Sequence, residues 1–232
     1  MSTKTLNPLD ASWLMVESRD TPMHVGGLLR PGFDLAATDD ELKAMYGLGT
    51  DIEANRATAR RLLAEAGVPN LSFRLGSRPL APYPTMAIYL IDQWRRIGVT
   101  VEQQSLDTAP YFAAMTSGQF QAIIDFSTEF ADEPNIQWGK YLSIDRAPPP
   151  LNSARYTDRT IDQLFDRQYR TTDPAARRAL LRQIEARVFD QAYFAPLFWF
   201  QRIVVTSSAL HGWQITPSHL LNQDLADVWL AE

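Results

Sequence analysis

The chain has 232 residues, of which 45% are hydrophobic and 21% charged, and it carries a formal net charge of -5 with no cysteine. This composition excludes wholesale disorder, and the charge offers no electrostatic case for nucleic-acid binding. The absence of cysteine excludes disulfides, a thiol nucleophile and cysteine-ligated metals.

The start of the chain bears on its location. "MSTKTLNPLDASWLMVESRD" has no basic region followed by an apolar run of the length that a signal peptide needs. No stretch approaches the roughly 18 consecutive apolar residues that suggest a membrane span. As written, the sequence therefore predicts a chain that lacks a signal peptide and remains cytoplasmic.

The first predicted helix begins near Thr50. Glu53 follows Thr50 by three residues, which is the spacing of a capping box. The apolar pattern then runs through Leu62 and Leu63 and ends at Gly67, a residue type suited to the left-handed C-terminal position.

Three predicted strands follow, separated by two helices. The strands are residues 71–76, 99–103 and 120–126. One helix between them carries Met86, Leu90, Trp94 and Ile97 on one face and ends at Gly98, and the other runs from Thr108 and Pro110 to Gly118. This alternation predicts parallel strands joined by crossovers, and hence an α/β fold class.

The rest of the chain has less regular patterning. Residues 127–156 read as a long irregular region, which in compact domains is usually functional or mobile. One helix is predicted from about Asp158 with Ile161, Leu164 and Phe165 inward. A second starts at Asp173–Pro174, with Leu180, Leu181, Ile184 and Val188 inward. Residues 195–205 read as an apolar strand before a turn-rich end.

Motifs for catalysis are missing. The three histidines are far apart, and the sequence contains no HExxH, no Gly-rich phosphate loop after a strand and no GxSxG elbow. We therefore expect no catalytic residue, no metal site and no cofactor.

Ligand-binding candidates come from one loop and from aromatic residues. "DFSTEFADEPN" (residues 125–135) leaves the carboxyl end of the third predicted strand, where open α/β sheets bind ligands, although an ordinary exposed loop would look the same. Tryptophans could line an apolar cleft, whereas "LFWF" (residues 197–200) could equally be a core strand. The candidate ligand-binding residues are Phe126, Glu129, Phe130, Asp132, Asn135, Trp138 and Trp199.

Four stretches then resemble one known family. "DIEANRATARRLLAEAGVPN", "IDQWRRIGVTVEQQSLDTAPYFAAMTSGQFQAII", "DEPN" and "HGWQITPSHLLNQDLADVWLAE" are similar to the C-terminal half of family 5 extracellular solute-binding proteins, the peptide/nickel-type receptors of ABC importers. The resemblance covers about residues 31–232. It implies one lobe of a type II periplasmic-binding-protein fold over residues 31–195. Residues 196–232 would be a crossover strand and a C-terminal tail that belongs to a missing lobe.

The same resemblance implies a function without catalysis. The family captures a small-molecule or peptide ligand in the periplasm and delivers it to ABC permease subunits. Phe130 stands where peptide receptors of this family carry the aspartate that holds the ligand's amino group, so Glu129 or Asp132 would have to substitute. Without the other lobe, Phe198, Trp213 and Trp229 would be exposed.

The first thirty residues resemble a different family. "LNPLDASWLMVESRDTPMHVGGL" (Leu6–Leu28) is similar to the start of bacterial wax ester synthase/diacylglycerol acyltransferases. This resemblance makes an acyltransferase-derived protein the alternative interpretation. Acyl transfer itself is not expected, because the HHxxxDG motif on which those enzymes depend is absent. The sequence predicts a join near Leu29–Pro31, with residues 1–30 as an acyltransferase-like fragment. Gene fusion, a rearranged reading frame or an assembly artefact would each produce it.

Overall fold

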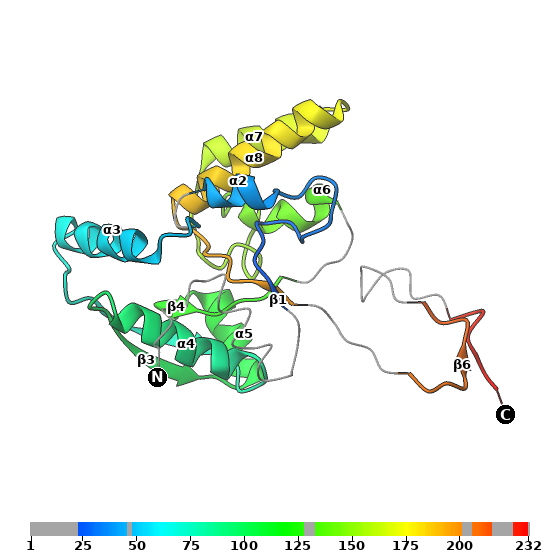
Figure 1. The fold of residues 1–232 in the computed structure, drawn as a ribbon, viewed down its shortest axis with the longest axis horizontal. Helices are drawn as coiled ribbons and strands as arrows, with labels where there is room; N and C mark the ends of the chain where they lie inside the picture. Colours follow the sequence, from blue (N-terminus) through cyan, green and yellow to red (C-terminus); the bar gives the residue numbers. More distant parts are fainter. Residues whose placement is uncertain (1–22, 46–47, 128–132, 201–205, 215–224, 232) are drawn as a thin grey trace. The chain divides into compact units, whose positions relative to one another are not determined.

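The computed structural model describes residues 23–45, 48–127, 133–200, 206–214 and 225–231 (Figure 1). The chain divides into two compact units. Unit 1 comprises Met1–Leu48, Ser127–Lys140 and Thr160–Glu232, and unit 2 comprises Gly49–Phe126 and Tyr141–Arg159. No helix among the described residues is both long enough and apolar enough to span a membrane. The boundaries at residues 30/31 and 195/196 stay predictions.

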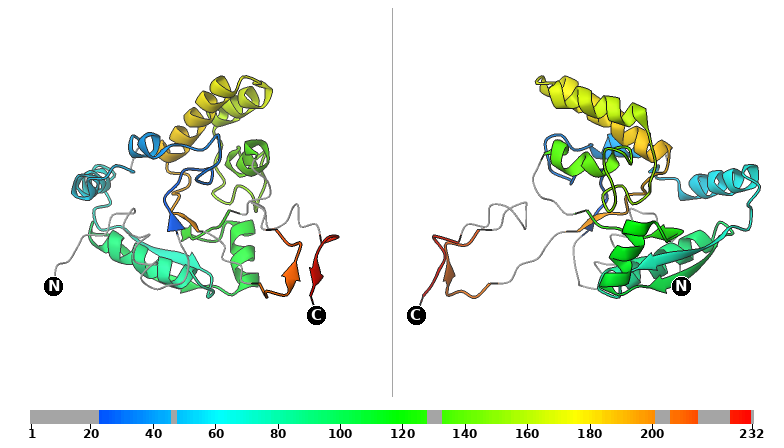
Figure 2. Two further views of the ribbon diagram at one scale, coloured as in Figure 1. Left: turned by 45° about the vertical axis from the view of Figure 1, so that its right-hand side comes forward. Right: turned by 180° about the vertical axis from the view of Figure 1, so that it is seen from behind.

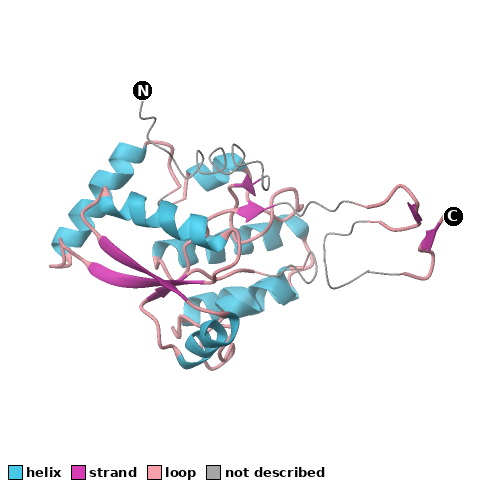
Figure 3. Ribbon diagram, turned by 90° about the horizontal axis from the view of Figure 1, so that it is seen from below, coloured by secondary structure: helices cyan, strands magenta, loops and turns pink. Residues whose placement is uncertain are grey.

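Unit 2 contains a three-stranded parallel sheet (Figure 3). Its strands are β2 (Ser72–Ser77), β3 (Thr100–Ser105) and β4 (Ala122–Ile123), in the order β3-β2-β4. The predicted parallel α/β arrangement is therefore confirmed. The strand predicted over residues 120–126 is shorter than expected: the Ile124 amide still donates to the Gly76 carbonyl (2.9 Å), whereas the Phe126 amide donates to the Asp125 carboxylate (2.7 Å).

Three helices accompany this sheet, α3 (Ile52–Glu65), α4 (Tyr83–Arg95) and α5 (Thr108–Ser117). The predicted helix stop at Gly118 is confirmed, since this residue adopts a left-handed φ of 74°. The α4 helix buries Met86 and Ala87 and leaves Trp94 half-buried, with its ring edge-on to Phe73 at 5.2 Å.

The start of α3 differs from the prediction by one residue. Asp51, and not Thr50, is the N-cap, and its carboxylate accepts a hydrogen bond from the Ala54 amide (3.0 Å). A capping residue needs extended backbone and an acceptor aimed at the first turn, and Asp51 provides both. The Arg56 side chain then ties α3 to α4 by donating to Gln93 (2.7 Å).

Unit 1 is built on two long helices, α7 (Arg159–Arg170) and α8 (Pro174–Asp190), which lie side by side in both views of Figure 2. Asp173 caps α8 through the Ala176 amide (2.8 Å), and Pro174 takes the first helical position, as predicted. All of the residues predicted to face inward on these helices are buried: Ile161, Leu164, Phe165, Leu180, Leu181, Ile184 and Val188. The shorter elements of unit 1 are α2 (Asp39–Lys43), α6 (Pro134–Gln137) and the 3-10 helix η1 (Trp138–Tyr141), which ends in unit 2.

Two short antiparallel pairs complete the described part of unit 1. β1 (Met23–His24) pairs with β5 (Trp199–Phe200). Of the strand predicted over residues 195–205, residues 195–198 are not in a strand, and residues 201–205 lie outside the described residues. β6 (Leu210–His211) pairs with β7 (Trp229–Leu230), and we call this pair the C-terminal ribbon.

The exposure expected of three aromatic residues is found for one of them. Trp229 is 57% exposed, whereas Phe198 and Trp213 are half-buried. The Trp229 ring stacks on His211, with 4.4 Å between the ring centroids.

Candidate functional site

The candidate residues fall in different parts of the chain. Glu129, Phe130 and Asp132 lie outside the described residues. Phe126 belongs to unit 2, whereas Asn135, Trp138 and Trp199 belong to unit 1. The surroundings of each described residue are therefore given within its own unit.

Phe126 lies at the carboxyl edge of the unit 2 sheet. The chain runs from β2 to β3 on one side and then returns to β4 on the other side of β2. β2 and β4 therefore flank the point where the strand order reverses, which is where open α/β sheets bind ligands. Arg78 follows the last residue of β2, and Phe126 follows β4 by three residues.

Four aromatic rings surround the Arg78 guanidinium at this edge. Its Cζ atom lies 5.6–5.8 Å from the ring centroids of Tyr83, Tyr111, Phe112 and Phe126. Arg78 Nε is buried and has no hydrogen-bond partner among the described residues. A guanidinium with an unpaired Nε–H, held among aromatic rings, is suited to a planar anion such as a carboxylate. We call these five residues the Arg78 cluster.

The two tyrosines of the cluster stay neutral at physiological pH. The Tyr111 hydroxyl donates to the Ile124 carbonyl (2.8 Å), and its side chain is fully buried. Burial raises the pKa of both phenols, and the Asp125 carboxylate raises them further against the opposing effect of Arg78. The positive charge at the centre of the cluster is therefore not offset by a phenolate.

Sequence reasoning missed Arg78, Tyr83, Tyr111 and Phe112. A usable signal was present, because "SRP" (residues 77–79) follows the first predicted strand directly and so marks a carboxyl end. The rings, however, come from two helices and a loop, and periodicity does not show that they converge.

Asn135 is held by a polar network in unit 1. Its side-chain oxygen accepts a hydrogen bond from Gln168 (2.5 Å), which is fully buried. The Gln168 oxygen accepts from Arg177 Nε (3.1 Å), and Arg177 also forms an ion pair with Glu133. Glu133 in turn caps α6 through the Asn135 amide (3.1 Å). The network fastens α6 to α7 and α8.

Both candidate tryptophans donate their indole N–H groups to the chain itself. Trp138 is fully buried and donates to the Leu28 carbonyl (3.2 Å). Trp199 donates to the Gly27 carbonyl (2.9 Å).

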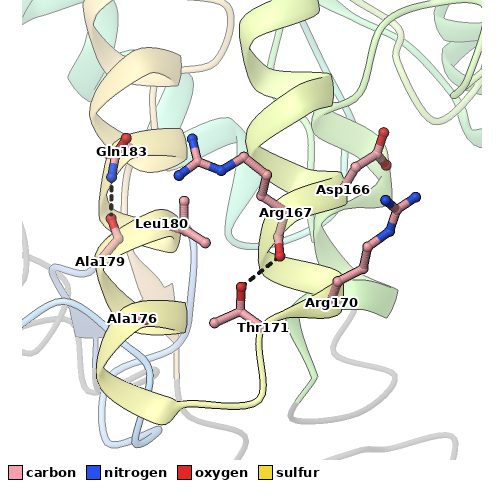
Figure 4. A pocket seen from close by; sticks show the side chains of 8 residues that line it. All are labelled: Asp166, Arg167, Arg170, Thr171, Ala176, Ala179, Leu180 and Gln183. Atoms are coloured by element: carbon pink, nitrogen blue, oxygen red, sulfur yellow. Dashed lines mark hydrogen bonds between the residues drawn. The ribbon is translucent and has the colours of Figure 1, made fainter.

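A hollow of about 490 Å³ lies in unit 1 between α7 and α8 (Figure 4). Arg167, Arg170, Thr171 and Gln183 line it, and the Thr171 hydroxyl and Gln183 amide hydrogen-bond to backbone carbonyls of their own segments. None of the candidate residues lines it. Among the described residues, no group of three or more His, Asp or Glu side chains could hold a metal ion.

Comparison with known proteins gives matches among solved structures only. No protein-family model and no curated protein matches the chain. A dipeptide-binding protein from Pseudoalteromonas sp. SM9913, solved with Met-Leu, matches with a TM-score of 0.74 at 16% identity over 97% of this chain and 44% of that chain.

Two further structures match in the same way. The ABC transporter-associated periplasmic binding protein DppA from Helicobacter pylori, solved with the peptide STSA, gives a TM-score of 0.72 at 15% identity over 98% of this chain and 43% of its own. OppA from Burkholderia pseudomallei gives 0.68 at 20% identity over 79% and 36%.

These matches establish the fold. The chain has part of the periplasmic-binding-protein fold, which confirms the predicted fold class. It spans less than half the length of each of these three structures. The identities are too low to carry more than the fold from those proteins to this one.

Proposed function

We propose that this chain captures a small solute, most simply a peptide with a free carboxylate, as the binding component of an ABC importer. One observation carries the proposal: the Arg78 guanidinium lies among four aromatic rings at the carboxyl ends of β2 and β4. One matched structure is a dipeptide-binding protein in complex with Met-Leu and another is a periplasmic binding protein in complex with the peptide STSA, which supports this choice of ligand.

The chemistry of the Arg78 cluster favours a carboxylate next to an apolar side chain. The guanidinium offers paired N–H donors that match the two carboxylate oxygens. The surrounding rings lower the local dielectric constant, which strengthens that charge pair, and they offer apolar surface to the rest of the ligand. The other charged candidates, Glu129 and Asp132, would serve the ligand's ammonium group in this proposal.

The remaining features of the proposed function follow from the resemblance. The chain would bind without catalysing a reaction and deliver its ligand to ABC permease subunits. The family acts in the periplasm, whereas this chain as written is expected to remain cytoplasmic. The join to an acyltransferase-like fragment over residues 1–30 stays a prediction, and residues 1–22 lie outside the described part of the chain.

Calorimetric titration of the full chain tests the proposal. The ligands are Met-Leu, the peptide STSA and the C-terminal amide of Met-Leu, because only the amide removes the carboxylate charge. We expect the free acids to bind, and we expect amidation or Arg78→Gln to weaken binding by about 10- to 100-fold, the range for loss of a charge-assisted hydrogen bond.

Arg74→Gln is the matched control, because Arg74 has an exposed side chain and lies on β2, the strand that Arg78 directly follows. It should leave affinity unchanged. Circular dichroism of both variants shows whether they are folded. Equal binding of acid and amide, or no binding of any peptide by a folded chain, would overturn the proposal.

A further inference from the structure

A short segment near the start of the described chain is deeply buried in unit 1. Gly26 and Gly27 are buried, and Leu28 and Leu29 are 3% and 1% exposed. Just before them, β1 pairs with β5 in the register His24↔Trp199. The segment His24–Leu29 therefore combines strand pairing with two buried leucine side chains, as a bound peptide does.

Three side chains from distant parts of the sequence bind the backbone of this segment. The Leu28 amide donates to Glu185 (2.5 Å). Trp199 donates to the Gly27 carbonyl, and Trp138 donates to the Leu28 carbonyl. Hydrogen bonds to backbone groups hold a segment of chain whatever its side chains, so the sequence preference must come from shape.

The shape admits only glycine at two positions. A Cβ atom on Gly27 would overlap the Glu185 carboxylate, and one on Gly26 would lie 2.5 Å from Trp199 Cδ1. Neither side chain can move away easily, because Glu185 is fully buried and the Trp199 indole is held by its hydrogen bond to the Gly27 carbonyl. The two glycines allow the backbone to approach its hydrogen-bond partners this closely.

The side chains that bind the His24–Leu29 segment depend on it for their own hydrogen bonds. Glu185 is completely buried, and its charge is balanced by Arg182 (2.6 Å) and by the Leu28 amide. If the segment left, a buried carboxylate and a buried indole N–H would lose hydrogen-bond partners, which is costly in an apolar interior.

We infer that Trp138, Glu185 and Trp199 form a groove specific for a Gly-Gly-Leu-Leu segment that follows a paired strand, which the chain's own His24–Leu29 segment occupies. The segment docks as a peptide would, so that a separate peptide of the same sequence binds when the native segment is displaced. The segment belongs to unit 1 as a folded element.

The first test measures the melting temperature of full-length variants. Gly27→Ala should lower Tm by about 5–10 °C, whereas Gly139→Ala, with no atom within 4 Å of its new Cβ, should stay within about 1 °C of the unsubstituted chain. Because Gly27→Ala overlaps Glu185, the double variant Gly27→Ala/Glu185→Ala should melt higher than the sum of the two single effects predicts. Additive effects would overturn the inference, as would equal Tm values for the two glycine variants.

The second test adds the peptide MHVGGLLRP, blocked at both ends, to the same proteins and follows tryptophan fluorescence. The Gly27→Ala chain should bind it, and the unsubstituted chain should not, because its groove is full. A peptide with alanine in place of the residue equivalent to Gly27 should not bind. Failure of the first peptide to bind a folded Gly27→Ala chain, or equal binding of both peptides, would overturn the inference.

Discussion

Glu185 shows at the scale of one residue how unit 1 accommodates a charged side chain in its interior. Burial raises its pKa above the ordinary value of 4.5, and Arg182 and the Leu28 amide oppose that shift only in part. The same burial lowers the pKa of Arg182. Each charge is therefore tolerated because the other is beside it.

A pH dependence of stability follows from Glu185. With a raised folded-state pKa, the folded protein holds the proton at pH values where the unfolded chain has released it. The contribution of Glu185 to the free energy of unfolding is thus complete below about pH 4.5 and falls as pH rises through the folded pKa.

The measurement compares urea unfolding of the unsubstituted chain and of Glu185→Gln at several pH values. The difference in unfolding free energy, unsubstituted minus variant, should decrease from pH 4 toward neutrality. A difference that grows with pH would show that Arg182 lowers the pKa of Glu185 more than burial raises it.

At the scale of an element, the network around Gln168 holds α6 against α7 and α8. Gln168→Ala would leave the Asn135 carbonyl and one Arg177 donor without their partner, at a cost of about 1–3 kcal/mol. Tyr169→Ala, at the adjacent and 65% exposed position, should cost less than about 0.5 kcal/mol. Chemical denaturation measures both, and equal effects would mean that water replaces the network.

The start of α3 gives a second prediction at this scale. Asp51→Ala should destabilise the protein by about 1 kcal/mol because it removes the acceptor for the Ala54 amide, whereas Thr50→Ala should have little effect. Thermal unfolding of the pair distinguishes the two capping residues. A larger effect at Thr50 would restore the capping box that the sequence suggests.

These elements also show what sequence patterns can reveal. The alternation of strands and helices in unit 2, the inward faces of α7 and α8 and the Asp173–Pro174 start were predictable because periodicity and capping are local. The Arg78 cluster and the Glu185–Leu28 bond were not. The second joins residues 157 positions apart, and local pattern holds no information on such pairs.

At the scale of the whole molecule, large apolar side chains are exposed in the part of the chain that the structure describes. On the C-terminal ribbon and the turn before β7, Leu225, Trp229 and Leu230 are 57–68% exposed. A two-stranded ribbon is marginally stable by itself.

The rate of amide hydrogen exchange should therefore differ between the C-terminal ribbon and the rest of the described chain. Residues 206–214 and 225–231 should exchange within seconds, whereas β2, β3 and α8 should retain protection for much longer. Mass spectrometry of peptic fragments resolves these regions. Strong protection of residues 225–231 in a monomeric sample would mean that the ribbon is covered, and protection only at high concentration would mean that copies associate through it.

The close approach at Gly27 has a consequence for how this sequence can diverge. A side chain at position 26 would occupy space that Trp199 fills, and a side chain at position 27 would occupy space that Glu185 fills. The members of each pair lie far apart along the chain. A lineage can acquire a side chain at position 27 only after the acid at position 185 has been replaced by something smaller. Related sequences should therefore show correlated substitution between these positions, with each glycine fixed for as long as its large partner remains.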